Sequence, residues 1–596
     1  MLNQSHLSKF ISEQGFSDYW ALYQWSIEKP EEFWEAFRRF AKIPVDGEAL
    51  NFAECLMRYA SEDPAIIFRD ESGLRRVWSG IELRNAVSAY ARLMRERGVA
   101  AGDRVAALLP NLPETIAVML AAASMGAIWS SCSPDFGLEG VRDRFAQIEP
   151  KLLFSTRSYR FGGKEFSLES RLSELRSHLS GLKEIVWIDE LPPGIDEPIR
   201  FEQLPQDHPL FILYSSGTTG LPKCIVHSAG GTLVQILKEQ MLHVDLRAAE
   251  KLFYYTTCGW MMWNWLVVGL ACGATLVLYD GSPLWPESSV LWDMAEEEGI
   301  SHFGTSAKYL ALLEKRSYRP REHHELRALR QILSTGSPLM PASFDFVETQ
   351  IKAGVHLSSI SGGTDIVSCF VLGNPLLPVH RGELQCAGLG MDVQVWDETG
   401  NRIWDADGEL VCVNRFPSMP IGFWKDPEGK AYRAAYFERF PGVWRHGDWA
   451  RQNSQTKGFT IFGRSDTTLN PGGIRIGTAE IYRQVETLEE IVECVAAGQQ
   501  WDGDVRIVLF VRLREGVDLT ASLEQRIRAV LKSKASPHHV PKKILVVNDI
   551  PRTINGKISE AAVRDAIHGK MSSNLAALGN PESIKEFQGR PELLQD

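Results

Sequence analysis

The most informative stretch of the chain is residues 214–227, which read Tyr-Ser-Ser-Gly-Thr-Thr-Gly-Leu-Pro-Lys-Cys-Ile-Val-His. It directly follows the apolar run Leu210–Leu213. Gly217 and Gly220 let the backbone approach a ligand closely, while hydroxyl groups and Lys223 meet negative charge. This composition favours a loop that holds a polyphosphate.

The loop differs from the phosphate-binding loop of common kinases and ATPases, which has four residues between its glycines and then Lys-Ser/Thr. Only Thr218 and Thr219 separate Gly217 from Gly220, and Cys224 follows the lysine. Taken alone, the stretch also fits a flexible surface turn, because turn residues cluster in loops generally. The remaining motifs of the chain must therefore decide between the two interpretations.

Composition sets the broad class of the protein. A chain of 596 residues predicts about three or four domain-sized units, and 44% hydrophobic residues suffice for substantial cores. The net charge of −11 argues against nucleic-acid partners, which need a basic face. The apolar stretch from Trp265 to Tyr279 is interrupted by glycines and is too short for a membrane span, so it predicts a buried helix that runs into a strand.

The cysteines and the N-terminus bear on location. Nine cysteines are scattered singly, without metal-binding spacing, which favours a reducing cytoplasm over a disulfide framework. The first residues show no basic region followed by an apolar block, so no secretory signal is expected.

The alternation of patterns along the chain predicts an α/β fold. Val105–Leu109 indicates a strand, Pro113–Met125 a helix and Ala127–Ser130 a second strand, and similar successions recur around 252–280 and 300–336. Such alternation predicts mostly parallel sheets covered by helices. After Leu384 short alternating strands indicate a smaller β-rich subdomain, and beyond Asp466 a compact α+β unit follows.

We therefore expect four regions. Residues 1–60 form a helical cap whose aromatic side chains pack on the main body, and residues 61–465 form a large domain whose β-rich part is about 384–465. Residues 466–570 form a small mobile α+β domain, and 571–596 a tail on the surface.

Five further motifs follow the glycine-rich loop in a fixed order. They are Ser361-Gly-Gly-Thr-Asp365, His446-Gly-Asp448, Gly463-Arg-Ser-Asp466, Asn470-Pro-Gly-Gly-Ile-Arg475 and Pro551-Arg-Thr-Ile-Asn-Gly-Lys557. With them the chain resembles the adenylate-forming acyl-CoA synthetases across nearly its whole length. Taken alone, the Ser-Gly-Gly, Gly-Asp and Gly-Arg motifs would most often be turns, whereas the Pro-Arg-Thr-x-x-Gly-Lys context already argues against a solvated surface lysine at 557. The joint order of all five motifs makes the resemblance specific.

The resemblance implies a site for ATP and AMP. The glycine-rich loop would hold the β- and γ-phosphates, Gly336–Pro338 and Ser361–Gly363 would line the adenine, and Asp448 and Arg464 would bind the ribose. A carboxylate such as Asp448 can accept hydrogen bonds from both ribose hydroxyls. The full set of nucleotide residues is Ser215, Ser216, Gly217, Thr218, Thr219, Gly220, Lys223, Gly336, Ser337, Pro338, Ser361, Gly362, Gly363, Asp448 and Arg464.

The resemblance also implies catalytic groups. Lys557 would stabilise the charge that builds up when a carboxylate attacks the α-phosphate, with Thr364 and Arg475 on the same phosphate. Asp365 stands where most members of the family carry a glutamate that helps to hold Mg²⁺, so its arm is one methylene shorter. We expect Mg²⁺ with ATP, and a lysine acetyltransferase and deacetylase that act on Lys557.

Coenzyme A would approach from the side of the hinge. By resemblance Asp466 is the hinge of the small domain, which rotates after adenylation so that Gly472 and Gly473 line the pantetheine tunnel. Arg160 and Lys164 resemble the basic segment that contacts the nucleotide part of CoA. A plain hairpin at 471–473 and an ordinary basic surface loop are the competing interpretations.

The acyl pocket points to a short keto acid. Relatives specific for acetate carry tryptophans before the motif threonine, whereas this chain has Gly362 and Gly363, so we expect extra space, walled in part by Trp260. Together with Leu50-Asn-Phe-Ala-Glu54 and the tail, this variant resembles the branch that activates acetoacetate. The alternatives are propionate or butyrate as substrate, or a non-catalytic adenylate-binding protein; a carrier-loading adenylation domain is disfavoured because no carrier domain follows.

Overall fold

The computed structural model describes most of the chain. The described residues are 5–44, 47–190, 194–215, 221–465, 469, 471, 476–501, 504–534, 539–553, 556–570, 575 and 578–595. None of the described helices is both long enough and apolar enough to cross a membrane.

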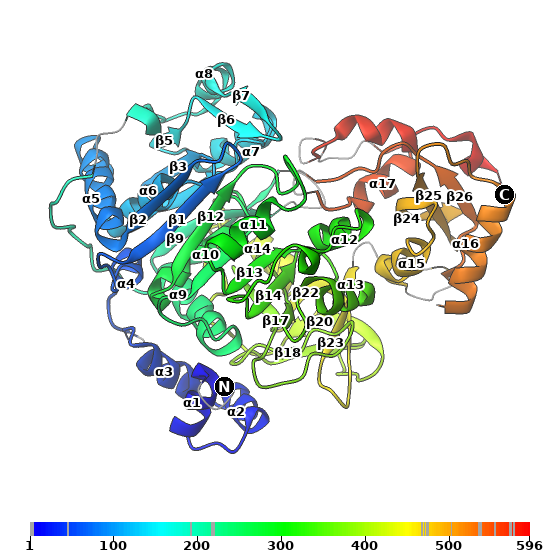
Figure 1. The fold of residues 1–596 in the computed structure, drawn as a ribbon, viewed down its shortest axis with the longest axis horizontal. Helices are drawn as coiled ribbons and strands as arrows, with labels where there is room; N and C mark the ends of the chain where they lie inside the picture. Colours follow the sequence, from blue (N-terminus) through cyan, green and yellow to red (C-terminus); the bar gives the residue numbers. More distant parts are fainter. Residues whose placement is uncertain are drawn as a thin grey trace.

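Two seven-stranded sheets form the large domain (Figure 1), and they confirm the predicted α/β class. The first sheet is parallel except for its edge strand β2. Its order is β15 (His356–Ser359), β14 (Gln331–Thr335), β13 (His302–Ser306), β11 (Lys251–Tyr254), β12 (Thr275–Asp280), β1 (Pro64–Asp70) and β2 (Arg75–Ser79).

The second sheet is parallel from β9 to β8 and carries an antiparallel hairpin at its other edge. Its order is β21 (Gly422–Phe423), β10 (Lys223–Ser228), β9 (Pro209–Ser215), β4 (Ile128–Cys132), β3 (Arg104–Leu108), β5 (Leu152–Ser155) and β8 (Glu184–Trp187). Further helices of the large domain are α5 (Gly80–Glu96), α7 (Leu138–Ile148), α8 (Glu169–His178), α11 (Val290–Glu297), α12 (Ala307–Lys315) and α13 (Pro341–Phe346).

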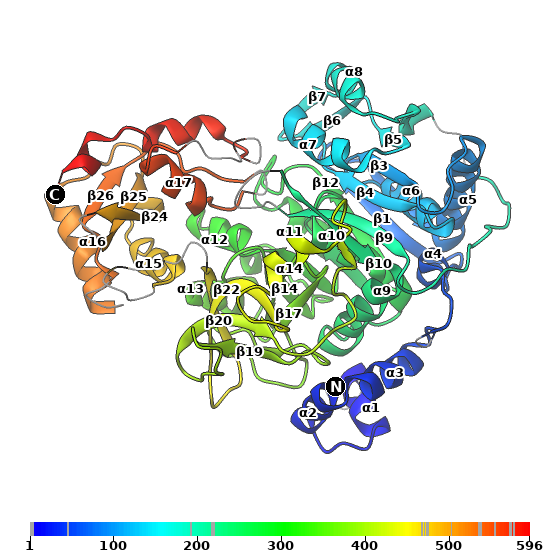
Figure 2. The same cartoon turned by 180° about the vertical axis from the view of Figure 1, so that it is seen from behind.

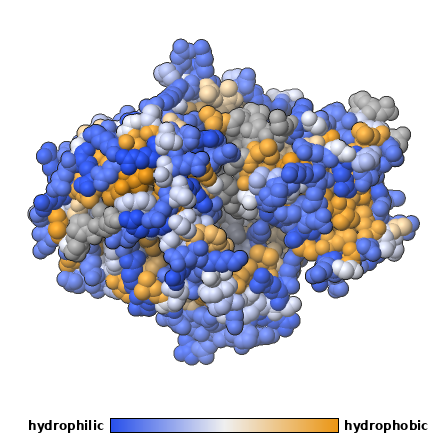
Figure 3. Space-filling model, turned by 90° about the horizontal axis from the view of Figure 1, so that it is seen from above, coloured by the Kyte–Doolittle hydropathy of each residue, from blue (hydrophilic) through white to orange (hydrophobic). Residues whose placement is uncertain are grey.

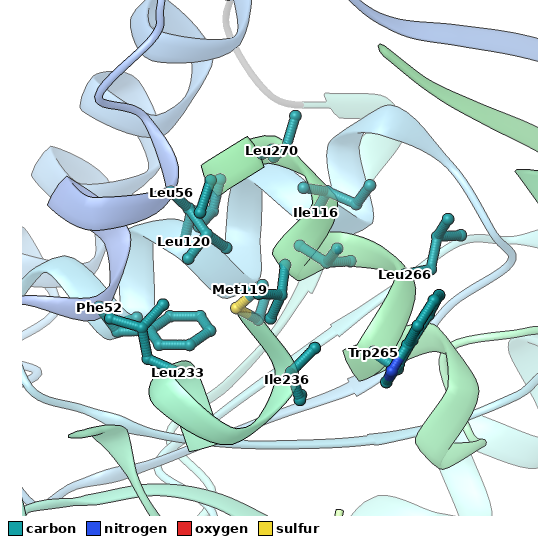
Figure 4. Packing of buried hydrophobic residues seen from close by; sticks show 14 of the residues in the cluster. Phe52, Leu56, Ile116, Met119, Leu120, Leu233, Ile236, Trp265, Leu266 and Leu270 are labelled. Carbon is teal, nitrogen blue, oxygen red and sulfur yellow. The ribbon is translucent and has the colours of Figure 1, made fainter. Parts of the chain in front are cut away.

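A helical layer supplies much of the core (Figure 4). It combines α4 (Phe52–Leu56), α6 (Pro113–Ser124), α9 (Ala229–Lys238) and α10 (Met261–Val267). Helix α6 is buried on nearly all sides, as its apolar sequence requires, and Pro113 occupies its first turn, where no N–H partner is lost. Each large side chain buried here contributes about 1.5–3 kcal/mol relative to exposure. The predicted helix-to-strand stretch is confirmed as α10, a 3₁₀ turn and β12.

The N-terminal cap consists of α1 (His6–Glu13), α2 (Tyr19–Glu28) and α3 (Pro30–Ala41), seen in blue in Figure 1. Phe33 and Phe37 are fully buried in the core that continues into the large domain. The hydroxyls of Tyr19 and Tyr23 donate to the carbonyls of Ala387 and Met391, both at 3.1 Å. The expected role of the aromatic residues in packing the cap is thus confirmed.

A β-rich subdomain follows the first sheet. Its antiparallel sheet has the order β19 (Val393–Trp396), β20 (Asp407–Cys412), β22 (Trp444–Gln452) and β23 (Phe459–Arg464). Beside it lie helix α14 (Lys430–Tyr436) and the small sheet of β16 (Ser361–Gly363), β17 (Ser368–Leu372) and β18 (Cys386–Ala387).

The C-terminal domain lies beside α12 and α13, as both ribbon views show (Figure 1, Figure 2). It contains α15 (Thr478–Val485), β24 (Ile491–Trp501), β25 (Asp504–Leu513), α16 (Ala521–Lys534), β26 (Lys543–Val546) and α17 (Glu560–Ile567). The segment 578–595 packs into its core, where Ile584, Phe587 and Leu593 are buried. On the face drawn in Figure 3, hydrophilic residues predominate and hydrophobic residues form separated patches.

The tail should stabilise the C-terminal domain. The ring of Phe587 is fully buried and lies 4.7 Å from that of Phe510. We expect Phe587→Ala to lower the free energy of unfolding of this domain by about 3–5 kcal/mol, measured by chemical denaturation. Leu594→Ala, at a side chain that is 76% exposed, is the control. Equal stability of the two variants would contradict the packing described above.

Candidate active site

The site lies at the carboxyl edge of the first sheet. Strands β13, β14 and β15 are parallel neighbours, and they end at Ser306, Thr335 and Ser359. The two segments predicted to line the adenine, Gly336–Pro338 and Ser361–Gly363, follow β14 and β15 directly. The Thr335 hydroxyl donates to the Ile360 carbonyl at 2.9 Å and ties the two strand ends together. Ligands of α/β sheets bind at such edges.

The glycine-rich loop connects the antiparallel strands β9 and β10. Ser215 and Lys223 face each other in the register of this hairpin, so both ends of the loop lie side by side. The predicted residues between them, Ser216, Gly217, Thr218, Thr219 and Gly220, lie outside the described residues. Asp466, Gly472, Gly473 and Arg475 also lie outside them.

Asp365 lies among groups that keep it ionised. The Tyr436 hydroxyl donates to its Oδ1 at 2.5 Å. Burial alone would raise the pKa of Asp365, but Lys223 and this hydrogen bond outweigh burial and lower the pKa below its ordinary value. The carboxylate is therefore charged at neutral pH. One ionised carboxylate near Lys223 fits Mg²⁺, which is usually bound by one or two carboxylates together with substrate phosphates.

The two predicted ribose residues lie opposite each other in the subdomain sheet. Asp448 on β22 pairs with Arg464 on β23, and Arg464 Nη1 donates to Asp448 Oδ1 at 3.2 Å. Asp448 is largely buried, whereas the Arg464 side chain is half exposed. His446, two residues before Asp448, lies 3.6 Å from its carboxylate. The hairpin β22–β23 thus places both residues without help from distant segments.

Lys557 comes from the C-terminal domain and reaches the same region. Asp448, Arg464 and Asp365 all act electrostatically on its ammonium group. The side chain of Lys557 is exposed at the surface. Desolvation by the protein atoms around its ammonium group nevertheless lowers the pKa of Lys557, and the negative charge of Asp448 opposes this shift. The structure therefore brings together the predicted catalytic lysine, the predicted metal ligand and the predicted ribose residues.

The segment before Lys557 is held from two sides. Arg552 Nη1 donates to the Gly556 carbonyl at 2.9 Å, and Lys308 of α12 reaches the same oxygen at 3.5 Å. Gly556 has a φ of +73°, a conformation that favours glycine. Lys308 is the one contact among these that crosses from the large domain.

Thr364 contributes its backbone to a buried histidine. His227 Nε2 lies 3.0 Å from the Thr364 carbonyl, and because a carbonyl only accepts, Nε2 must carry the proton. Burial lowers the pKa of His227 to about 4, so the ring is neutral. This bond fixes the backbone of the motif between Gly363 and Asp365.

The space expected at Gly362 is absent, which corrects the sequence interpretation. A Cβ at Gly362 would lie 2.1 Å from the Ser368 carbonyl, because β17 runs against it. A Cβ at Gly363 would instead meet His446 at 3.4 Å, an ordinary contact. Of the two glycines, therefore, only Gly363 can accept a Cβ atom without a backbone shift.

The tryptophans near the predicted acyl pocket differ in burial. Trp260 is half-buried, with its ring 5.3 Å from that of Phe136. Trp263 and Trp265 are fully buried and donate to Asn111 and Glu239. They belong to the core, and Trp260 alone of the three keeps a partly open face.

Arg160 and Lys164 lie on an exposed hairpin formed by β6 (Ser158–Phe161) and β7 (Lys164–Ser167). Glu71 anchors its turn, accepting from the backbone N–H groups of Gly162 and Gly163 at 2.8 and 2.9 Å. A Cβ at Gly163 would lie 2.7 Å from the ring of Trp285. The turn is thus fixed although both basic side chains remain open to solvent.

None of the nine cysteines forms a disulfide. Burial raises the pKa of the Cys224 thiol to about 12, so the thiol beside Lys223 is protonated at neutral pH. Among the described residues, no cluster of three or more His, Cys, Asp or Glu side chains could hold a metal by itself.

Comparison with known proteins agrees with this geometry. The family of AMP-binding enzymes matches residues 52–416, and its C-terminal domain matches residues 483–557. The chain is 50% identical to the acetoacetyl-coenzyme A synthetase of Rhizobium meliloti (strain 1021), with 100% of this chain and 98% of that protein covered. The chain belongs to the acetoacetyl-CoA synthetase family of AMP-binding enzymes. It is also 45% identical to the acetoacetyl-CoA synthetase of Gallus gallus, covering 97% of this chain and 94% of the relative.

Solved structures give the same picture. An acetoacetyl-CoA synthetase from Streptomyces lividans matches with a TM-score of 0.93 and 39% identity, covering 98% of this chain and 97% of that chain. An anthranilate CoA ligase in complex with anthranoyl-AMP matches with a TM-score of 0.75 over 87% of this chain and 96% of that chain. At 18% identity this second likeness bears on the fold alone. The expected membership of the adenylate-forming synthetases is confirmed.

The sequence interpretation missed three side chains of the site, Tyr436, His446 and Lys308. Tyr436 lies more than seventy positions from its partner Asp365, and no motif marks it. His446 was part of a quoted motif, yet only the fold brings it next to Gly363. Lys308 follows β13, and the strand end was the one available signal for it.

The anchoring of the β6–β7 turn is open to a direct test. Glu71 receives three backbone hydrogen bonds, the third from Ser282 at 3.0 Å. Hydrogen bonds to charged groups contribute about 1.5–3 kcal/mol, so Glu71→Gln should accelerate amide hydrogen exchange at Gly162 and Gly163 about tenfold or more. Glu165→Gln, on the same hairpin, is the control. Unchanged exchange in the Glu71 variant would refute the anchoring role.

Proposed function

We propose that the protein joins acetoacetate to coenzyme A at the expense of ATP, through an acetoacetyl-adenylate, and releases AMP and pyrophosphate. The observation that carries this proposal is that Asp448, Arg464 and Asp365 all act electrostatically on Lys557 in a chain 50% identical to an acetoacetyl-CoA synthetase. A binding protein without turnover would need no cation delivered from a separate domain.

Different residues of the site bind the phosphates, the adenine and the ribose of ATP. Ser215, Lys223 and the loop between them hold the β- and γ-phosphates, and their adjacent positions in the β9–β10 hairpin support this role. Gly336–Pro338 and Ser361–Gly363 line the adenine at the sheet edge. Asp448 accepts hydrogen bonds from the ribose hydroxyls, and Arg464 orients that carboxylate.

The first step is an in-line displacement at the α-phosphorus. A carboxylate oxygen of acetoacetate forms a bond to phosphorus, while the bond to the bridging oxygen breaks and pyrophosphate leaves with the electron pair. Negative charge accumulates on the phosphoryl oxygens, where Lys557, Thr364 and Arg475 stabilise it. Mg²⁺, held by Asp365 and the phosphates, would supply further positive charge.

The second step forms the thioester. The CoA sulfur attacks the acyl carbon, the bond to AMP breaks with its electron pair on the phosphate oxygen, and the thiol proton passes to solvent. Rotation about Asp466 withdraws Lys557 and brings Gly472 and Gly473 beside the thiol, while Arg160 and Lys164 hold the nucleotide part of CoA. Because Lys557 serves the first step alone, its acetylation by a lysine acetyltransferase would switch the enzyme off.

We also place the protein in the cytoplasm. Nine unpaired cysteines, most of them buried, suit a reducing compartment. All three substrates are small soluble molecules, which is consistent with this compartment.

The choice of acid tests the function itself. We expect acetoacetate-dependent exchange between labelled pyrophosphate and ATP, with a specificity constant for acetoacetate at least tenfold above that for butyrate, because a buried donor that meets the keto oxygen loses about 1–3 kcal/mol when left unpaired. Equal constants for the two acids would defeat the assignment of acetoacetate. Products ADP and orthophosphate would defeat the adenylate route.

The role of Lys557 predicts a split between the two half-reactions. Lys557→Ala should slow adenylation about 10²–10³-fold, as expected for the loss of a group that stabilises transition-state charge. Thioester formation from supplied acetoacetyl-adenylate should be unchanged. Lys570→Ala, an exposed lysine of the same domain, is the control. Equal loss of both half-reactions would contradict the proposed division of labour.

Gly363 offers a test of the acyl pocket. Gly363→Trp should narrow the pocket next to His446 and shift the preferred acid from acetoacetate towards acetate, measured as relative specificity constants. Binding of AMP, measured by calorimetry, shows whether the variant is intact. Intact AMP binding with an unaltered acid profile would remove Gly363 from the pocket. Gly362→Trp is unsuitable, because β17 leaves no room for a side chain there.

A further inference from the structure

Tyr436 connects two groups of the site that the sequence motifs treat separately. It is the last residue of α14, and its hydroxyl donates to Asp365 Oδ1 at 2.5 Å. The ammonium of Lys223 lies 5.3 Å from the centre of its ring, within the range of a cation–π contact. One tyrosine therefore contacts both the predicted metal ligand and the lysine at the end of the glycine-rich loop.

The ring of Tyr436 is fixed independently of these two contacts. It stacks on Trp444, with ring centres 3.8 Å apart and an angle of 14° between the planes. Phe423 and Tyr432 pack edge-on at 5.8 and 5.4 Å. Because the aromatic neighbours hold the ring, the hydroxyl has a fixed position, and its hydrogen bond orients the carboxylate of Asp365.

The hydrogen bond also decides which oxygen of Asp365 is available. Tyr436 occupies Oδ1, while Oδ2 lies on the side of Gly363, 3.8 Å from the position of a Cβ there. Among the described residues, Oδ2 has no hydrogen-bond partner of its own. The carboxylate thus presents one free oxygen towards the segment predicted to line the nucleotide.

We propose that Tyr436 is a positioning residue that holds Asp365 and Lys223 in place for the divalent cation and the phosphates of the nucleotide. The proposal rests on the function proposed above and adds a residue that no motif contains. A short aspartate arm reaches the cation only if its orientation is fixed, and the tyrosine fixes it. Partners that orient metal ligands typically change metal affinity 10–100-fold when removed.

Tyr436→Phe tests the hydroxyl alone, because the variant keeps the ring, its stacking on Trp444 and its contact with Lys223. We expect the affinity for Mn²⁺ in the presence of ATP, measured by electron paramagnetic resonance of the free ion, to fall about tenfold or more. Tyr432→Phe is the matched control: it removes a hydroxyl from the same helix, one turn earlier, that has no hydrogen-bond partner among the described residues. Its Mn²⁺ affinity should equal that of the unaltered protein.

A second variant separates the two contacts. Tyr436→Leu removes the ring as well, so metal-free ATP, measured by calorimetry with a chelator present, should bind more weakly to it than to Tyr436→Phe. Asp365→Asn reports on the metal site itself. If it loses Mn²⁺ affinity while Tyr436→Phe does not, the positioning role is refuted and the proposed function stands. If Asp365→Asn keeps full affinity, the metal role in the proposed function fails.

Discussion

The arrangement of the candidate site depends on one electrostatic constraint, the gathering of cations in one region of a chain whose net charge is −11. Lys557, Lys223 and Arg464 come from three different regions, and each is balanced by Asp365 or Asp448 when no ligand is present. Like charges held this close without counter-charges would repel one another. The two carboxylates therefore offset the repulsion among these cations.

The fold supplies these charges from separate units. The first sheet ends at the segments predicted to line the adenine, and the β9–β10 hairpin carries Lys223. The β22–β23 hairpin carries Asp448 and Arg464, and the C-terminal domain carries Lys557. Of these residues, only Lys557 belongs to the C-terminal domain. The described contacts of this domain with the large domain are both polar, as between Lys308 and the Gly556 carbonyl, and apolar, as between Met340 and the core of the C-terminal domain.

Much of this could be predicted from sequence because it is local. The alternation of apolar runs gave the α/β class, and the helix-to-strand stretch from Trp265 to Tyr279 was recognisable because burial dictates composition. The ordered motifs gave the family. The close approach of β17 to Gly362 could not be judged from the residue at 362 alone, because it depends on the register in which β17 pairs with β16. Contacts between distant segments, such as that of Tyr436 with Asp365, were beyond reach.

The role of Tyr436 could not be predicted from the sequence either. Its helix has an unremarkable aromatic sequence, and such residues are most often core. The stacking on Trp444 is indeed core packing, yet the same packing fixes a hydroxyl against Asp365. Structural and functional roles are thus not alternatives at this position: the rigidity of the aromatic cluster is what gives the hydrogen bond its direction. Under the metal role that we propose for Asp365, the neighbouring structure supplies the orientation of this short acidic side chain, which a longer arm would otherwise find by itself.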